Sequence, residues 1–435
     1  MALGGGTWTS QDKVLPGSYI NFVSAARADS SLSDRGIAAM PLELDWGPEG
    51  EVFTVTSDDF RRKTRTIFGY TYADEKMKGL RDLFKNIRAG LFYRLGNGTA
   101  ASNTYATAKY AGTRGNVITI VIAKNADDDQ KYDVSTMFDT ELVDKQTVSA
   151  AAGLKPNDYV TWKSAQLAVT AGLPLTGGAN ATSVSGAAYQ SFLDAIESHS
   201  FHALGCLTTD TSAKALIVAW TKRMRDEVGM KFQTVLYQPE NADYEGVIAV
   251  KNKTTDADWP ESSAVYWLTG AQAGCAVDKS CTNKLYDGEF SIETPYTQVQ
   301  LAQNITEGML VFHRVGDSVR VLRDVNSLVT LSETKGADFK SNQTMRVLDQ
   351  IANDTAALFN AKYLGSFPND NAGRVSLWSD IVSLHQKLQT LRAIEGFESD
   401  HITVSQGDTK RAVVVNGVVT PVNAMEQLYM SVTVS

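Results

Sequence analysis

The stretch that decides the fold is the last one, RAVVVNGVVTPVNAMEQLYMSVTVS, which runs from Arg411 to Ser435. Asn416-Gly417 stands between β-branched residues, and this dipeptide favours the type I′ turn of a tight β-hairpin. After Pro421, the residues alternate between Leu428, Met430, Val432 and Val434 on one face and Tyr429, Ser431, Thr433 and Ser435 on the other. Alternation of this kind indicates a strand. The sequence therefore predicts a hairpin followed by a terminal strand.

The N-terminal end shows the same pattern. After Pro16-Gly17, Ser18, Ile20 and Phe22 alternate with Tyr19, Asn21 and Val23, which predicts a second terminal strand. A strand needs a partner for its N–H and C=O groups, so each end must join a sheet. That sheet belongs either to the same subunit or to a neighbouring copy that accepts a donated strand. The alternation itself does not choose between them.

Length and charge narrow the class of protein. The chain has 435 residues, of which 43% are hydrophobic, so it can form two to four domains at roughly 100 to 200 residues each. Its net charge of -8 argues against a nucleic-acid partner, because phosphate binding uses clustered Lys and Arg. The one basic run, Arg61-Arg62-Lys63, follows Asp58-Asp59 and is interpreted as a solvated helix face.

Cysteine usage and hydropathy bear on the compartment. Cys206, Cys275 and Cys281 are too scattered for a disulfide framework or a zinc site, so we expect buried thiols in a reducing cytosol. The sequence shows no signal-peptide pattern and no apolar run near the roughly 20 residues that cross a bilayer. We therefore expect no direct membrane insertion.

The first half of the chain predicts a core interrupted by an all-β insert. Strands are expected at 36–40, 51–56 and 91–94, and an amphipathic helix from Tyr72 to Ala89. Between Gly96-Asn97-Gly98 and Thr176-Gly177-Gly178 only strand periodicity occurs, at 106–110, 117–123, 132–138, 141–148, 159–162 and 167–170. Short strands at this spacing, with glycine-rich seams on both sides, predict an inserted β-sandwich.

The second half alternates strand and helix. Strands at 200–207, 232–237 and 244–250 are separated by a helix that Asp210 caps, and another helix is expected from Pro260 to Cys275. This βαβ pattern predicts a parallel sheet covered by helices. An α+β region follows, with a hairpin at Gly316-Asp317 between 309–314 and 318–322, helices at 342–363 and 374–394, and a strand at 402–404.

Motifs for chemistry are missing from the sequence. It contains no phosphate-binding loop and no Gly-x-Gly-x-x-Gly at a strand-to-helix turn, so no nucleotide cofactor is expected. None of His199, His202, His313, His385 and His401 forms a metal-ligand pair on a helix, and Asp127-Asp128-Asp129 lacks the spaced ligands of a calcium loop. We expect no catalytic residues, no cofactor and no metal.

Several stretches together resemble one family. They are Leu15–Tyr19 (LPGSY), Leu175–Asn180 (LTGGAN) with Tyr189–Leu204, Glu307–Phe312 (EGMLVF), Val319–Thr330 (VRVLRDVNSLVT) and Pro421–Met430 (PVNAMEQLYM). These motifs are similar to those of the sheath proteins of contractile phage tails and related injection machines. Val325 and Ser327 are mild departures from the motif of 319–330. The resemblance covers essentially the whole chain.

The resemblance implies a multidomain protein of α/β and α+β class. It comprises an N-terminal arm (1–24), the N-terminal part of the core (25–96), an inserted β-sandwich (97–180), a subtilisin-like α/β domain (181–330), a C-terminal α+β domain (331–412) and a C-terminal arm (413–435). "Subtilisin-like" describes topology only, because no Ser-His-Asp triad can be assembled from this sequence. The terminal strands are expected to be exchangeable between subunits.

The resemblance also implies a function. Strands Ser18–Val23 and Leu428–Val434 would be donated to neighbouring subunits of stacked hexameric rings around a tail tube, in a phage or phage-tail-like particle assembled in the bacterial cytoplasm. Partners would be the chain itself, the tail tube protein, the baseplate and the tail terminator. Lys387 and Arg392 are candidates for facing the tube, although an ordinary solvated helix face explains them as well. Two alternatives remain, an α/β hydrolase-like enzyme with an accessory β-sandwich and a non-contracting structural tube or coat protein.

Overall fold

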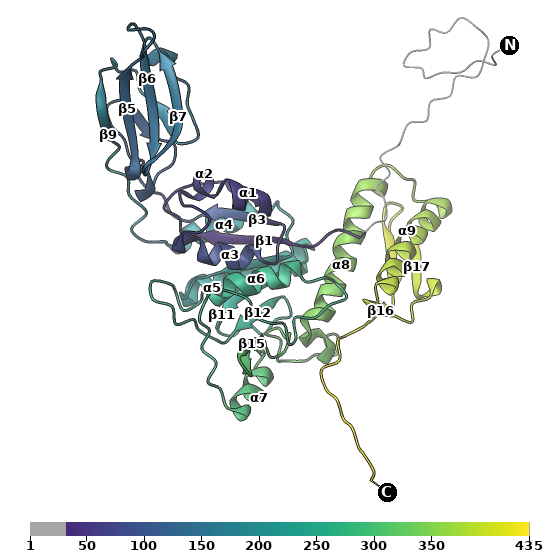
Figure 1. Cartoon of the computed structure of the whole chain (residues 1–435). Helices are drawn as coiled ribbons and strands as arrows, with labels where there is room; N and C mark the ends of the chain where they lie inside the picture. The colour runs from purple at the N-terminus through teal and green to yellow at the C-terminus, as the bar shows by residue number, and fades with distance from the viewer. Residues whose placement is uncertain (1–31, 435) are drawn as a thin grey trace, which may run out of the picture. The chain divides into compact units, whose positions relative to one another are not determined.

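The structure is a computed structural model that describes residues 32–434 (Figure 1). The described residues form two compact units. The larger unit contains residues 34–350 and 421–434, and the smaller unit contains residues 32–33 and 351–420.

A central sheet organises the larger unit. Its strand order is β13 (Met309–Leu310), β12 (Val247–Val250), β11 (Gln233–Tyr237), β10 (Ala203–Cys206), β1 (Ile37–Leu42), β3 (Ala89–Arg94) and β2 (Val52–Thr56). All neighbouring strands run parallel except β2, which is antiparallel to β3 at the edge. The predicted parallel sheet is therefore confirmed.

Helices cover both faces of this sheet, because successive side chains of a strand point to opposite faces. Ala38 and Met40 of β1 belong to the core with helices α3 (Lys78–Phe84) and α6 (Ala264–Gly274). Ala39 belongs to the opposite core, with α4 (Gly186–Ile196) and α5 (Thr211–Arg223). The first core also contains α1 (Ser57–Arg62) and α2 (Thr64–Phe68), through Phe60 and Phe68.

Local capping explains where two helices begin. Asp210 accepts a hydrogen bond from the Ala213 amide at 2.7 Å, which confirms the predicted cap of α5. The predicted helix from Tyr72 to Ala89 is wrong in length, because α3 begins at Lys78 after a 3₁₀ turn, Glu75–Met77. Arg81 Nη1 donates to the carbonyl oxygens of Tyr72 and Asp74, which holds that segment as a loop.

The insert is an all-β body, as predicted. Its larger sheet has the order β7 (Glu141–Val148), β6 (Tyr132–Phe138), β5 (Ile118–Lys124) and β9 (Thr170–Pro174). A second pair joins β4 (Ala106–Ala108) to β8 (Val160–Trp162). Ile118, Ile120 and Ile122 alternate into a core that they share with Val134 and Phe138. The last strand lies C-terminal to the predicted 167–170, since Thr119 pairs with Pro174 and Ile122 with Thr170.

The stretch 309–314 is divided between two sheets, which corrects its prediction as one hairpin strand. β13 joins the central sheet, and β14 (Phe312–Val315) forms the predicted hairpin with β15 (Ser318–Val321). The division occurs at Phe312, whose amide donates to Asn252 Oδ1 at 2.7 Å and whose carbonyl accepts from Asn252 Nδ2 at 2.8 Å. A side-chain amide thus replaces the ladder partner at this point. Helix α7 (Gln298–Thr306) precedes β13.

The smaller unit contains the end of one helix from residue 351 onward, a second helix and short two-stranded ladders, whereas residues 342–350 of the first helix belong to the larger unit. Helix α8 (Asn342–Leu358) continues as a π turn, Phe359–Tyr363, which agrees with the predicted helix. The predicted helix 374–394 is observed as α9 (Asn371–Thr390), followed by β16 (Ile394–Glu395). The helix ends there because Arg392 has a φ of 62°, a left-handed conformation that breaks the helical repeat.

The predicted hairpin at Asn416-Gly417 is wrong. Those two residues end β18 (Val413–Gly417), which pairs antiparallel with β17 (Ile402–Gln406) over its whole length. Neither of them has the positive φ of a type I′ turn. A five-residue ladder to β17 outweighs the turn preference of one dipeptide. The turn lies instead at residues 407–412, and the short β19 (Thr420–Pro421) follows β18.

The hydropathy of the helices was compared with what a membrane-spanning helix needs. Among residues 32–434, no helix combines the length and the apolar character that crossing a bilayer requires.

Candidate functional site

The segment after β19 divides into two parts with different environments. We call residues 423–426 the arm root and residues 428–434 the arm tip. Residues 422–434 form neither helix nor strand. The predicted terminal strand over 428–434 is therefore not formed within this single chain, and no hydrogen bond joins the backbone of the tip to another described segment. The predicted N-terminal strand, Ser18–Val23, lies outside the described residues.

Glu426 fixes one end of the arm root to the larger unit. Its Oε2 accepts a hydrogen bond from Arg323 Nε at 2.6 Å, and its Oε1 accepts one from Thr282 Oγ1 at 2.8 Å. The Arg323 side chain is about half exposed, so the ion pair by itself contributes at most about 1 kcal/mol to folding stability. Its contribution is therefore mainly geometric, because two partners fix the position of one carboxylate.

The other end of the arm root lies against the start of α8. Asn423 Oδ1 accepts from Ser341 Oγ at 3.0 Å and from Thr344 Oγ1 at 3.2 Å. The Ala424 amide donates to Gln343 Oε1 at 2.9 Å. A cavity of about 260 Å³ lies beside these contacts. The root is thus held by side chains from two separate parts of the larger unit.

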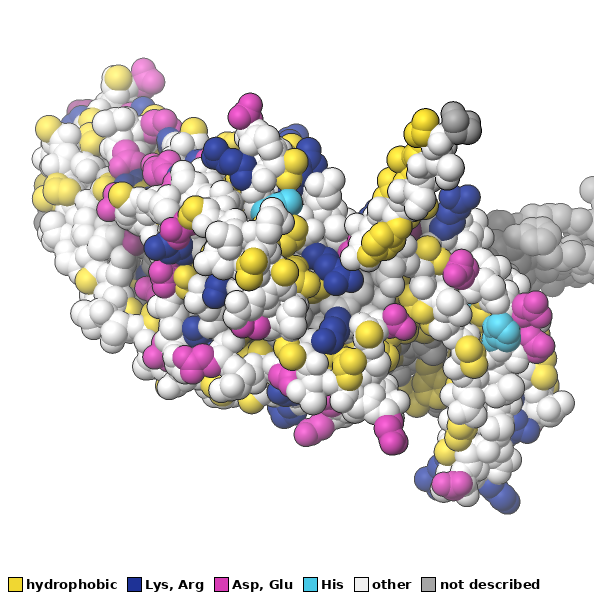
Figure 2. Space-filling view, turned by 90° about the horizontal axis from the view of Figure 1, so that it is seen from below, with side chains coloured by type: hydrophobic (Ala, Val, Ile, Leu, Met, Phe, Trp, Pro, Cys, Tyr) yellow, Lys and Arg dark blue, Asp and Glu magenta, His cyan; other side chains and the backbone are white. Residues whose placement is uncertain are grey.

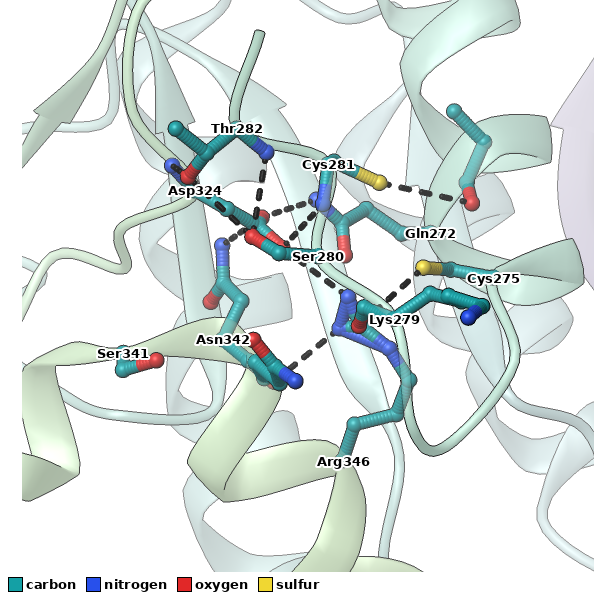
Figure 3. Close-up of polar contacts among 12 residues, drawn as sticks. Gln272, Cys275, Lys279, Ser280, Cys281, Thr282, Asp324, Ser341, Asn342 and Arg346 are labelled. Carbon is teal, nitrogen blue, oxygen red and sulfur yellow. Dashed lines mark hydrogen bonds and ion pairs between the residues drawn. The ribbon is translucent and has the colours of Figure 1, made fainter. Parts of the chain in front are cut away.

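A buried ion pair supports the residue next to Arg323. Asp324 Oδ2 accepts from Arg346 Nη2 and from the Cys281 amide, each at 2.9 Å (Figure 3). Its Oδ1 accepts from Gln272 Nε2 at 2.6 Å and from Asn342 Nδ2 at 2.9 Å. Asp324 and Arg346 are both buried. This network fixes the backbone that presents Arg323 and Thr282 to Glu426.

The arm tip is exposed although it is hydrophobic. The relative exposures are 85% for Leu428, 87% for Tyr429, 76% for Met430, 73% for Val432 and 92% for Val434. Figure 2 shows hydrophobic side chains along a segment that projects from the surface. Soluble monomers rarely leave such a row uncovered. In an extended conformation Leu428, Met430, Val432 and Val434 share one face, so the tip carries the pattern of a strand that lacks a sheet.

The smaller unit contains a sheet with an open edge. Among the described residues, β17 and β18 pair only with each other. β17 packs on α9, where Trp378 Nε1 donates to the Ile402 carbonyl at 2.9 Å. On β18, Val414 and Val415 are 42% and 40% exposed. A two-stranded sheet is marginal by itself, and the edge of β18 can accept a further strand.

The two candidate tube-facing residues do not lie on one helix face. Lys387 is in α9 and half-buried, whereas Arg392 is exposed in the turn after the helix. The prediction that both lie on the polar side of one helix is wrong, because the helix ends before Arg392.

Sequence reasoning missed the arm root. The stretches 319–330 and 421–430 are far apart in the sequence, and in the structure Arg323 and Glu426 join them. The opposite charges of Arg323 and Glu426 were the signal in the sequence that these two stretches could be in contact. The contribution of Thr282 had no signal in the sequence, because Thr282 lies in the segment between α6 and α7 and belongs to neither stretch.

A matched pair of substitutions tests the role of the arm root. In Glu426→Ala, we expect unfolding free energy to fall by less than about 1 kcal/mol, because the ion pair is exposed. Amide exchange at Ala424 should nevertheless accelerate several-fold, since the root loses Arg323 and Thr282 together. Hydrogen exchange with mass spectrometry measures this. Glu395→Ala, at an exposed carboxylate outside the root, is the control. Unchanged exchange at residues 423–426 would show that Glu426 does not hold the root.

Comparison with known families accounts for nearly all of the described chain. Residues 35–95 match the tail sheath protein Gp18 domain III N-terminal region, and 96–180 match the phage tail sheath protein beta-sandwich domain. Residues 182–327 match the phage tail sheath protein central domain, and 334–435 match the phage tail sheath C-terminal domain. Four sheath domains therefore follow one another in this sequence.

Individual relatives agree with this result. The phage-like element PBSX protein XkdK of Bacillus subtilis is 32% identical, with 100% of both chains covered. The crystal structure of a sheath tail protein from Desulfitobacterium hafniense is 36% identical, with a TM-score of 0.82 over 95% of this chain and 99% of that one. The anti-feeding prophage helical sheath in its contracted state shares the fold, with a TM-score of 0.58 at 12% identity over 97% and 99%. This chain belongs to the phage tail sheath protein family.

Proposed function

We propose that this chain is the subunit of a contractile sheath, which polymerises as stacked hexameric rings around a tail tube and shortens to drive the tube through a target envelope. The observation that supports this most is the contrast within the C-terminal arm. An anchored root is followed by a tip whose apolar side chains are 73–92% exposed at the alternate positions 428, 430, 432 and 434. A strand without a sheet in its own subunit suits a partner that is another copy.

The arm tip, Leu428–Val434, would add to the sheet of a neighbouring subunit, and Ser18–Val23 would do the same from the N-terminal end. The open edge of β18 is our candidate acceptor. Strand addition supplies main-chain hydrogen bonds, and the alternating side chains select the register. The exposed Val414 and Val415 offer apolar contact to an incoming strand with the composition of the tip.

A strand donated from one subunit to another would allow the sheath to contract without coming apart. A donated strand is held by a ladder at its tip and by a separate contact at its root, and the chain between them can bend. Subunits could then change pitch and diameter while they remain joined. The work would come from the free-energy difference between two packings of the same folded domains, summed over many copies, without ATP. The domains would move nearly as rigid bodies.

Finer features of the proposal concern organisation and partners. We propose that the chain is divided into an N-terminal arm (1–24), the N-terminal part of the core (25–96), the inserted β-sandwich (97–180), an α/β domain (181–330), a C-terminal α+β domain (331–412) and a C-terminal arm (413–435). The α/β domain would have a subtilisin-like topology. The partners would be the chain itself, the tail tube protein, the baseplate and the tail terminator, with no nucleic acid and no membrane insertion. Assembly would take place in the cytoplasm of the bacterial host, and the product would be a tail or tail-like particle without enzyme activity.

Electron microscopy of the purified full chain tests this function. We expect hollow striated cylinders, and two populations of pitch and diameter once cylinders are exposed to a contraction trigger such as dilute urea. Cylinders that keep a single pitch under all conditions would favour a non-contracting tube. A protein that stays monomeric at high concentration and hydrolyses ester probes would favour the hydrolase-like alternative.

A further inference from the structure

A surface cavity lies between the end of α6 and the loop that follows this helix. Its volume is about 400 Å³, and small-molecule sites range from about 300 to 1,000 Å³. None of its lining residues, all from the described part of the chain, is Asp or Glu. Its wall is therefore positively charged, although the whole chain has a net charge of -8. The polar lining residues are Asn86, Lys279, Ser280, Thr282, Asn283 and Lys284.

Backbone carbonyl oxygens beside the cavity are already hydrogen-bonded. Arg35 donates from Nε to the Cys275 carbonyl at 2.8 Å and from Nη2 to the Gln272 carbonyl at 3.2 Å. Arg320 Nη1 donates to the Asn283 carbonyl at 2.9 Å. The contacts of Arg35 also offset the negative end of the α6 dipole, which would otherwise repel an anion. The wall thus offers a ligand mainly hydrogen-bond donors.

Two cations at or beside the cavity have no carboxylate partner. Within residues 32–434, neither Lys284 nor Arg35 forms an ion pair, and Arg35 donates only to backbone carbonyls. Burial and the nearby Arg346 guanidinium lower the pKa of Arg35 to about 10, as expected for a positive charge that its surroundings do not fully compensate. Lys279 is exposed and pairs with Asp278 at 3.0 Å. The positive charge at the wall is therefore only partly neutralised.

Asn86 adds a side-chain amide that has no acceptor. It lies between α3 and β3, far in sequence from the loop after α6. Its Nδ2 is buried and makes no hydrogen bond to any described residue. A buried donor without a partner is unfavourable and needs an explanation. Rotation of the Asn86 side chain toward a ligand in the cavity would give this donor an acceptor oxygen.

We propose that this cavity binds an oxyanion, a phosphate or carboxylate group, through the ammonium groups of Lys279 and Lys284 and the side-chain amide of Asn86. Lysine is a common phosphate ligand, and hydrogen bonds between charged groups are stronger than those between neutral ones. The site adjoins the arm root, because Thr282 lines the cavity and donates to Glu426. The oxyanion comes either from solution, as free phosphate, or from a carboxylate of another copy of this chain.

Equilibrium dialysis with radiolabelled inorganic phosphate tests the site in the full chain. The unassembled protein is taken from the supernatant after ultracentrifugation, and sodium chloride keeps the ionic strength constant. We expect the wild type to bind phosphate saturably, with one ion per chain. Lys284→Met should weaken binding more than about tenfold, because a hydrogen bond between charged groups is lost. Asn86→Asp should weaken it at least as much, because it places a carboxylate in the wall.

The matched control is Lys155→Met, which removes an exposed lysine of the inserted β body. It should bind phosphate like the wild type, and circular dichroism of each variant establishes that the chain has folded. Absence of saturable binding in the wild type would overturn the proposal. Equal weakening in Lys284→Met and Lys155→Met would also overturn it, because the attraction would then depend only on net charge.

The same dialysis on sedimented cylinders distinguishes the two sources of the oxyanion, and only this comparison rests on the proposed function. If the ligand is free phosphate, the assembled protein should bind as much phosphate as the unassembled protein. If a carboxylate of another copy occupies the cavity, assembly should reduce phosphate binding more than about tenfold, and Lys284→Met should assemble less than Lys155→Met. Failure to form cylinders would contradict the proposed function, whereas the result for the unassembled protein decides the oxyanion site.

Discussion

Deletion of Leu428–Ser435 is expected to abolish polymerisation while the remaining chain stays folded. The tip contributes no contact to the core, since its side chains are 73% exposed or more at every apolar position. In an assembled sheath, burying each of these side chains would contribute roughly 1.5–3 kcal/mol, and each ladder hydrogen bond about 0.5–1.5 kcal/mol. Sedimentation and electron microscopy should show monomers with an unchanged melting temperature.

A single substitution in the same segment separates backbone pairing from hydrophobic contact. Met430→Pro removes one amide donor and fixes φ, so a donated strand should fail at this residue. We expect assembly to fall by more than about tenfold, comparable to the deletion. Met430→Leu keeps both the backbone and the apolar volume and serves as the matched control. If Met430→Pro assembled like Met430→Leu, donation of the arm tip as a strand would be refuted.

The second large effect concerns the stability of the larger unit. Asp324→Ala is expected to lower the free energy of unfolding by about 3–5 kcal/mol, because it leaves the buried Arg346 guanidinium without its carboxylate. The Gln272, Asn342 and Cys281 donors also lose an acceptor. Urea denaturation followed by circular dichroism measures this difference.

Two comparisons make the interpretation of Asp324→Ala specific. Glu426→Gln alters the exposed ion pair of the adjacent Arg323 and should cost less than about 1 kcal/mol. The double variant Asp324→Ala/Arg346→Met should recover part of the loss, because it removes the unpaired buried charge. A loss for Asp324→Ala as small as that for Glu426→Gln would mean that water reaches this pair.

Some elements could be predicted from the sequence because their signal is local. The strands at 132–138 and 141–148 occur with the predicted bounds, since strand periodicity is a property of each segment by itself. The cap at Asp210 is a contact over three residues, so its side chain specifies the start of α5. Two boundaries were missed because they have no such local signal. The start of α3 depends on hydrogen bonds from Arg81, and the division between β13 and β14 depends on hydrogen bonds with Asn252.

The sequence by itself determined the succession of a core, an all-β insert, a parallel α/β sheet and an α+β region, because periods of two and 3.6 residues are properties of each segment. It also determined that the last residues have the alternation of a strand. Only the tertiary structure decided that Asn416-Gly417 lies within a ladder rather than at a turn, because pairing with β17 depends on residues outside the dipeptide. Only the tertiary structure joined Glu426 to Arg323 and Thr282, since contacts between distant segments follow from how the chain packs.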